Sequence, residues 1–210
     1  MRLEGQNIRV TCRSLARHSR RRRFHGDDGS VLAESALLVP FFVLLLFGML
    51  EFGGAFRDYL TLSNAASTGA RQAGIQGNSA SADWNIIVAI KEASGAMPLS
   101  QITRIAIFKA SSPTAGLPTN CDTGGVANCN SYDATTVASV SAAIAQPASW
   151  GNCTGPTSYY CPTSRIVSAS NPDYLGVWVQ IVHPWITGLF GKTITMTQTS
   201  IIRLEPQTIG

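Results

Sequence analysis

The sequence predicts an α+β protein in which a long amino-terminal transmembrane helix continues into a small domain with an antiparallel sheet and disulfide-pinned loops. Three observations predict this fold class. An uncharged, mostly apolar run covers positions 35–50. Two segments with alternating β-branched residues, 175–182 and 193–203, are typical of paired strands. Four cysteines lie in the irregular region 111–173, which is rich in Ser, Thr, Gly, Asn and Pro.

Residues 1–29 form a basic leader. Eight arginines against three acidic residues give this segment a formal net charge of +5, whereas the whole chain is +4 with an isoelectric point near 8.9. The positive-inside rule keeps such a segment in the cytoplasm. The arginine run 20–23 could also suggest nucleic-acid binding. No aromatic interleaving or recognition motif accompanies it, so we expect no nucleic-acid partner.

Residues 30–74 are expected to form one helix that is transmembrane in its first part. Positions 30–56 carry only Glu34 and Glu51 as charged residues, and a bilayer core takes roughly 20 apolar residues in a helix. Pro40 lies inside this run and is predicted to kink the helix, because it removes one backbone hydrogen bond. A cleavable signal peptide is the alternative, although the run is longer than a signal core and no small-x-small site closes it.

The positions of three of the charged residues that close or follow the apolar run can be predicted. Glu51 is expected near the outer interface as a snorkelling carboxylate, with a contact to a second subunit as the alternative. Asp58 and Arg71 are expected on the more polar side of the helix.

Glu34 lies inside the apolar end of the span, where a carboxylate is costly and marks a functional candidate. The alternative is that it only reaches the headgroup layer. Gly29 stands five residues before it, directly after the charged leader.

The spacing of Gly29 and Glu34 looks like the cleavage site of type IV prepilins. A longer pattern resembles the TadE-like family, the minor pseudopilins of tight-adherence (Flp) pilus systems, in three stretches: ESALLVP at 34–40, FGMLEFG at 47–53 and AASTGARQAG at 65–74. The resemblance implies a pilin-like domain and cutting between Gly29 and Ser30 by a membrane prepilin peptidase. It also implies that other pilins or pseudopilins and the pilus assembly platform are partners, at the bacterial inner membrane.

Cutting after Gly29 would create a positive amine at Ser30 in a low-dielectric environment. Glu34 of a neighbouring subunit could pair with that amine, because two charges that are poorly solvated are more stable together. A repeated head-to-tail contact of this kind builds a helical filament. The domain would then lie in the periplasm or outside the cell.

Residues 75–210 are expected to form the exported α+β domain. The pattern predicts a helix over 84–93 with Asp83 as its cap, a strand over 102–110 and a modest helix over 133–146. The connection 183–192 reads as a hairpin loop with an apolar tip. We expect this tip to pack on the domain's own core, with contact to lipid or a partner as the alternative.

The cysteines of this domain are expected to form disulfides in an oxidising compartment. Four cysteines allow three pairings, and we favour the two local ones, Cys121–Cys129 and Cys153–Cys161. A metal site is the alternative. Eight-residue separations suit zinc poorly, so we expect no metal.

No catalytic constellation is recognisable in the sequence. A hydrolase would depend on His183, with Asp133 or Asp173 as its partner, and no HExxH, Walker or calcium-loop motif is present. We therefore expect no enzyme activity and no cofactor. The alternative to a pseudopilin is an uncleaved single-pass envelope protein whose exported domain is a binding module.

Overall fold

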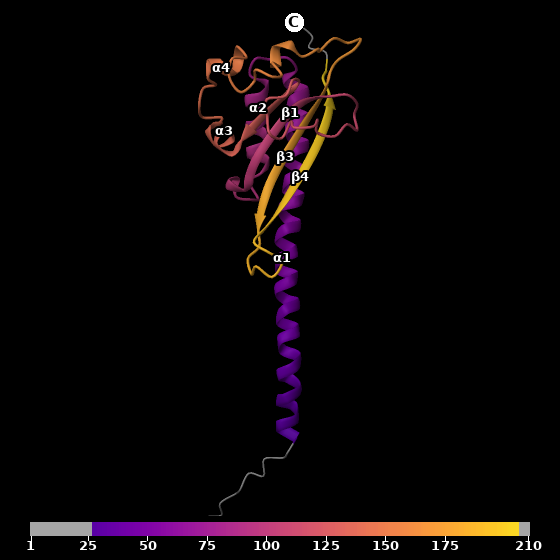
Figure 1. Cartoon of the computed structure of the whole chain (residues 1–210), viewed down its shortest axis with the longest axis vertical. Coiled ribbons are helices and arrows are strands. Elements are labelled where there is room, and N and C mark those ends of the chain that lie inside the picture. The colour runs from indigo at the N-terminus through magenta and orange to yellow at the C-terminus, as the bar shows by residue number, and fades with distance from the viewer. Residues whose placement is uncertain (1–26, 206–210) are drawn as a thin grey trace, which may run out of the picture. The chain divides into compact units, whose positions relative to one another are not determined.

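The computed structural model describes residues 27–205 (Figure 1). The leader predicted for residues 1–29 therefore lies almost entirely outside the described residues. The chain divides into two compact units, Met1–Leu44 and Leu45–Gly210. The described elements, in chain order, are α1 (Asp27–Gln76), α2 (Ala82–Ala93), η1 (Leu99–Gln101), β1 (Ile102–Ala110), β2 (Cys129–Asp133), α3 (Ala134–Ser139), α4 (Ala148–Gly151), η2 (Pro162–Ser164), β3 (Tyr174–Pro184) and β4 (Thr193–Arg203).

Helix α1 confirms the long amino-terminal apolar helix. It has 50 residues and continues through Pro40, so the proline does not end it, and the kink stays a prediction. The helix ends at Gln76. Gly77 follows it, adopts a left-handed conformation with φ 53° and donates its N–H to the carbonyl of Ala73. Glycine is favoured at such a helix end because it has no side chain to clash in this conformation.

The sheet is four-stranded and antiparallel, in the order β2-β1-β3-β4. This confirms the predicted α+β class, and the three strands expected over 102–110, 175–182 and 193–203 are all present. Strand β2 was not predicted, because its sequence CNSYD has neither an apolar run nor a period of two. Its five residues form a strand because they pair with β1. Such pairing depends on tertiary context and cannot be predicted from the strand propensity of the residues alone.

One face of the sheet packs on α1 and α2. Buried side chains of both helices and of β1 and β3 share one core cluster, which includes Leu62, Ala66, Ala73, Ile87, Ile90, Ile105, Ile107, Val177 and Val179. Gly69 allows the helices to approach each other, because a Cβ at this position would lie 2.6 Å from Cγ1 of Ile90. The small residues Ala66, Gly69 and Ala73 of α1 are thus covered by its own domain.

The opposite face of the sheet is covered by the irregular segment after β1. Its core cluster contains Phe108, Trp178 and the disulfide between Cys121 and Cys129. The ring of Phe108 lies over the paired Gly176, where a Cβ would come within 2.3 Å of the ring. Only a glycine leaves room for that ring.

Two predicted helix details are wrong. Ser81 and not Asp83 is the N-cap residue of α2, because the helix begins at Ala82 and Asp83 lies in its first turn. The Asp83 carboxylate instead binds Tyr132 and Arg165, which are far along the chain. The helix predicted over 133–146 is limited to α3, whose N-cap Asp133 accepts from the N–H of Thr136. Lys91 of α2 donates to three carbonyl groups at the end of α3, those of Val137, Ala138 and Val140.

Candidate functional site

The predicted processing segment lies in the first described turns of α1. Gly29, Ser30 and Glu34 are all exposed, and a Cβ at Gly29 would meet no atom within 4 Å. Among residues 27–205, Glu34 has no hydrogen-bond or ion-pair partner. The first N–H groups of a helix lack intrahelical acceptors, so opening this turn breaks few hydrogen bonds.

The apolar part of α1 beyond this segment is also exposed. Among the described residues, α1 is the one helix long and apolar enough to cross a membrane, by length and composition. Leu37 is 81% exposed and Met49 is 70% exposed. A long continuous run of exposed apolar side chains is unfavourable in water and is stabilised where lipid or other apolar side chains cover it. The exposure therefore supports a membrane anchor.

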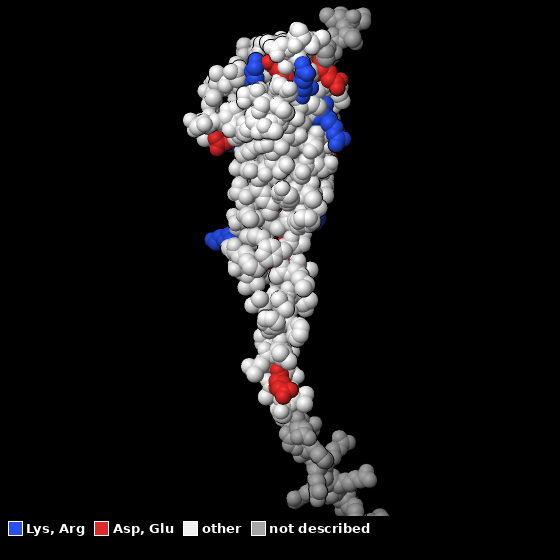
Figure 2. Space-filling model, turned by 90° about the vertical axis from the view of Figure 1, so that its right-hand side faces the viewer, with Lys and Arg blue, Asp and Glu red and all other residues white. Residues whose placement is uncertain are grey.

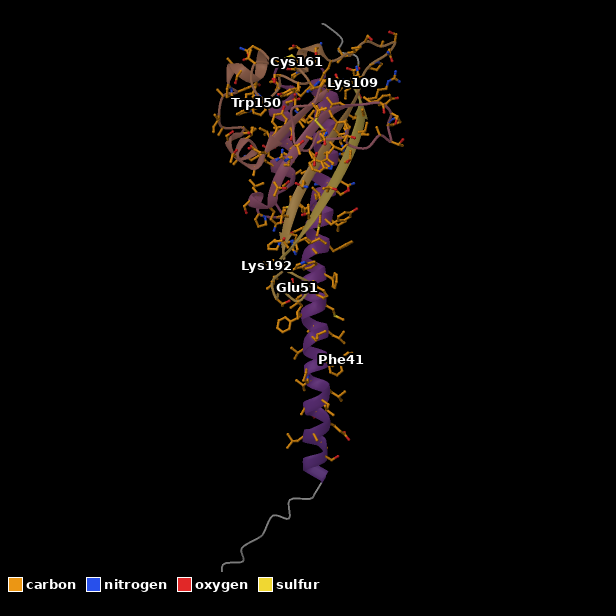
Figure 3. All side chains as sticks on the ribbon, in the orientation of Figure 1. Phe41, Glu51, Lys109, Trp150, Cys161 and Lys192 are labelled. Atoms are coloured by element: carbon orange, nitrogen blue, oxygen red, sulfur yellow. A yellow bond between two sulfur atoms is a disulfide. The ribbon has the colours of Figure 1, made fainter. Side chains whose placement is uncertain are left out.

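Glu51 does not snorkel into solvent. It is 1% exposed and accepts hydrogen bonds from the N–H of Ile186 at 2.9 Å, from the N–H of Thr187 and from the hydroxyl of Thr187 at 2.6 Å. These donors belong to the loop between β3 and β4, so this carboxylate fixes the loop on α1. Figure 3 shows Glu51 at the level of the loop.

Asp58 is buried, contrary to its predicted place on the polar side of α1. Its Oδ2 lies 2.7 Å from Nδ1 of His183, and its Oδ1 accepts from the guanidinium of Arg57. The hydrogen bonds to these two partners offset the free-energy cost of removing the Asp58 carboxylate from water.

His183 cannot work with Asp133 or Asp173 as the hydrolase hypothesis required. Its partner is Asp58, whereas Asp133 caps α3 and Asp173 pairs with Lys109 at 2.7 Å. The other ring nitrogen, Nε2, is buried without a hydrogen-bond partner in the described part of the chain. A nucleophile–histidine–acid chain needs a hydroxyl or thiol at that nitrogen, and residues 27–205 place none there.

A second buried charge cluster joins α2 to the irregular region. Arg165 Nη2 lies 2.5 Å from Oδ1 of Asp83, and both side chains are fully buried. The hydroxyl of Tyr132 and the amide of Asn130 donate to Oδ2 of Asp83 at 2.5 and 2.8 Å. Burial, with the negative charge of Asp83 beside it, raises the pKa of Tyr132 well above its ordinary value. This cluster holds the loops in place and has no open access for a substrate.

Two disulfides tie the irregular region, Cys121–Cys129 and Cys153–Cys161, each with a sequence separation of 8. The Cα–Cα distances are 5.8 and 5.4 Å, in the usual range for a disulfide. All four cysteines of the domain are therefore bonded in pairs. Within the described residues, no group of three or more His, Cys, Asp or Glu side chains is placed to hold a metal ion.

Three features of the site were not found from the sequence: the loop contact of Glu51, the Asp58–His183 pair and the Asp83–Arg165 pair. Each joins residues more than 80 positions apart. One feature of the sequence could have indicated that these charged residues have partners. Charged residues are sparse beyond the leader, and an isolated charge within an apolar or uncharged stretch needs a partner when it is buried.

Residues 29–71 match the family model of TadE-like proteins. No curated protein and no solved structure matches the chain. The matched segment is about a fifth of the chain and contains Gly29, Ser30, Glu34 and the exposed apolar part of α1. The match supports an association with the membrane and with components of a tight-adherence pilus.

Proposed function

We propose, from the TadE-like segment that this chain carries at residues 29–71, that the protein is a membrane-anchored pseudopilin. It is a minor structural or assembly component of a tight-adherence (Flp) pilus. The observation that carries the proposal is that the matched segment coincides with the exposed apolar part of α1. The helix anchors the protein in the bacterial inner membrane, with the leader in the cytoplasm and the domain on the other side.

In this proposal the chain is a substrate and not an enzyme. A prepilin peptidase cuts the bond between Gly29 and Ser30, which lies in an exposed helical turn with no tertiary contact at Gly29. The free N–H groups of the first turn make local unwinding inexpensive, and unwinding gives a peptidase an extended strand to bind.

Glu34 is the residue proposed to pair with a neighbouring subunit. Its carboxylate is exposed and unpaired among the described residues, one helical turn after the amine that cutting creates at Ser30. In a bundle of helices, that amine and a neighbour's Glu34 are both removed from water and are more stable as an ion pair. The partners are thus other pilins or pseudopilins and the assembly platform.

Gly29→Leu is expected to abolish processing. A Cβ at this position would meet no atom of the described residues within 4 Å, so we expect the fold to be unchanged, and the loss would come from the peptidase, whose site must accept the glycine. Intact-mass measurement of membrane-extracted protein, made in cells that carry the peptidase, checks it. The wild type should begin at Ser30 and the variant should keep residues 1–29.

Gly48→Leu is the matched control for this experiment. It makes the same change in the same helix at a position where a Cβ also meets nothing within 4 Å, and it should be processed like the wild type. A wild-type protein that retains its leader while pili assemble would refute the pseudopilin proposal. That outcome would favour the uncleaved envelope protein with a binding domain.

Glu34→Ala is expected to leave a processed, membrane-inserted protein that fails to enter the pilus. Removing one member of a buried ion pair costs about 3–5 kcal/mol, and each 1.4 kcal/mol is about tenfold in an equilibrium constant. The amount in sheared pilus fractions, relative to the membrane fraction, should therefore fall more than about tenfold. Glu92→Ala removes an exposed glutamate of α2 and is the control. Normal incorporation of Glu34→Ala would contradict the pairing.

A further inference from the structure

The loop between β3 and β4 has an apolar surface that its own domain does not cover. Ile186 is 82% exposed, Leu189 56% and Phe190 47%. Phe190 and Trp185 also contact Phe52 of α1, with ring centroids 4.9 and 5.9 Å from the Phe52 ring. We call these five residues the loop patch. The expected burial of this tip in the domain core is therefore wrong.

The loop patch is continuous with the exposed apolar surface of α1. Phe52, which belongs to both, is 56% exposed, and Met49, one turn before it on the helix, is 70% exposed. Both lie in the unit Leu45–Gly210 together with the loop. Lipid or protein that covers α1 around Phe52 must therefore also come close to the β3–β4 loop.

Charges around the loop patch have the arrangement that an interfacial position requires. Glu51, the acidic residue at this level of α1, is 1% exposed, because the loop supplies its hydrogen-bond donors. Lys192 is the last residue of the loop and is exposed, and Figure 3 labels it there. Figure 2 shows charged side chains over the far end of the domain and a largely uncharged surface toward the loop on this face.

We infer that the loop patch lies in the interfacial layer of a phospholipid bilayer, as a second membrane contact beside the spanning helix. Tryptophan prefers this layer because its ring is amphipathic, and a lysine at its edge can reach the lipid phosphates. The loop replaces water as hydrogen-bond donor to Glu51, which allows a carboxylate at this depth. The contact fixes how far the domain stands from the membrane.

This inference rests on the membrane anchoring in the proposed function, and not on cleavage. The test uses the full chain in vesicles of phosphatidylcholine and phosphatidylglycerol, with bromine atoms near the headgroup end of the acyl chains. Bromine quenches tryptophan on contact. Trp84, Trp150 and Trp178 are 6%, 5% and 7% exposed within the protein, so they are shielded from lipid, and Trp185 is the tryptophan at the loop patch. We expect quenching in the wild type and its loss in Trp185→Phe.

A double variant, Leu189→Ser with Phe190→Ser, should reduce the quenching of Trp185, because the loop then withdraws from lipid. Ile144→Ser removes an apolar side chain that is 55% exposed outside the loop patch and should quench like the wild type. Flotation of the vesicles reports the anchor separately. Protein that floats without quenching overturns the inference alone, as does quenching that persists in Trp185→Phe. Protein that does not float overturns the proposed membrane anchor as well.

Discussion

Asp83→Ala is expected to lower the free energy of unfolding of the domain by about 3–5 kcal/mol, because it leaves the Arg165 guanidinium buried without its counter-charge. Both side chains are fully buried and 2.5 Å apart. What remains for Arg165 is the carbonyl of Tyr160 at 3.3 Å and the face of the Tyr160 ring at 4.6 Å. The change also takes an acceptor from Tyr132 and Asn130.

Denaturant unfolding of the full chain in detergent, followed by tryptophan fluorescence, measures this loss. The ring of Trp150 is stacked on Tyr132 with centroids 5.2 Å apart, so its emission reports on this region. Asp122→Ala, at an exposed aspartate, is the control and should change stability by no more than about 0.5 kcal/mol.

A pair of further variants separates charge from size. Asp83→Asn keeps the shape but not the charge, and it should remain strongly destabilising. Asp83→Leu combined with Arg165→Met should recover part of the loss, because an apolar pair no longer buries an uncompensated charge. A single Asp83→Ala variant within about 1 kcal/mol of the wild type would show that the ion pair is dispensable.

Removing the buried disulfide by replacing Cys121 and Cys129 with alanine is expected to cost about 2–3 kcal/mol, from the chain entropy of a short loop. Both cysteines are fully buried and lie in the cluster with Phe108 and Trp178. The variant should also loosen the segment after β1 that covers this face of the sheet. The same unfolding experiment measures the cost, and limited proteolysis locates the loosened segment.

The second disulfide supplies a matched comparison, because Cys153 and Cys161 have the same separation of 8 but are only partly buried. Mild reductant should open this bond first. Proteolytic sites should then appear within 111–173, while α1 stays intact. Cleavage inside α1 under the same conditions would show that the loops and the helix are not independent.

The sequence made the long helix and most of the sheet predictable, because both depend on local periodicity. The apolar run and small residues of α1 need no distant partner to form a helix, and the β-branched or alternating residues of β1, β3 and β4 are sufficient to predict strands. Strand β2 and the early end of α3 were not predictable in this way. The first depends on pairing with β1, and the second on carbonyl groups taken by Lys91, 46 or more residues away.

The candidate site shows the same division. Gly29, Ser30 and Glu34 could be singled out because their chemistry depends on spacing along one helix, and their processing and pairing roles remain proposals. The roles of Glu51, Asp58 and His183 depend on where the β3–β4 hairpin meets α1, which no local pattern contains. The helical period of the apolar and small residues predicts Asp58 on the more polar side of α1. In the fold, Asp58 is buried together with His183, a partner that lies 125 residues away in the sequence.

The amino-acid sequence by itself determined a long apolar helix with an acidic residue near its start, since hydropathy and spacing act within a single segment. Only the tertiary structure decided which acidic residues are buried, which loop contacts α1 and which apolar side chains remain uncovered. A buried charge requires a partner, and partners here come from segments far apart in the chain. These segments come into contact only when the chain packs, so no single stretch of the sequence predicts which charged residues will pair.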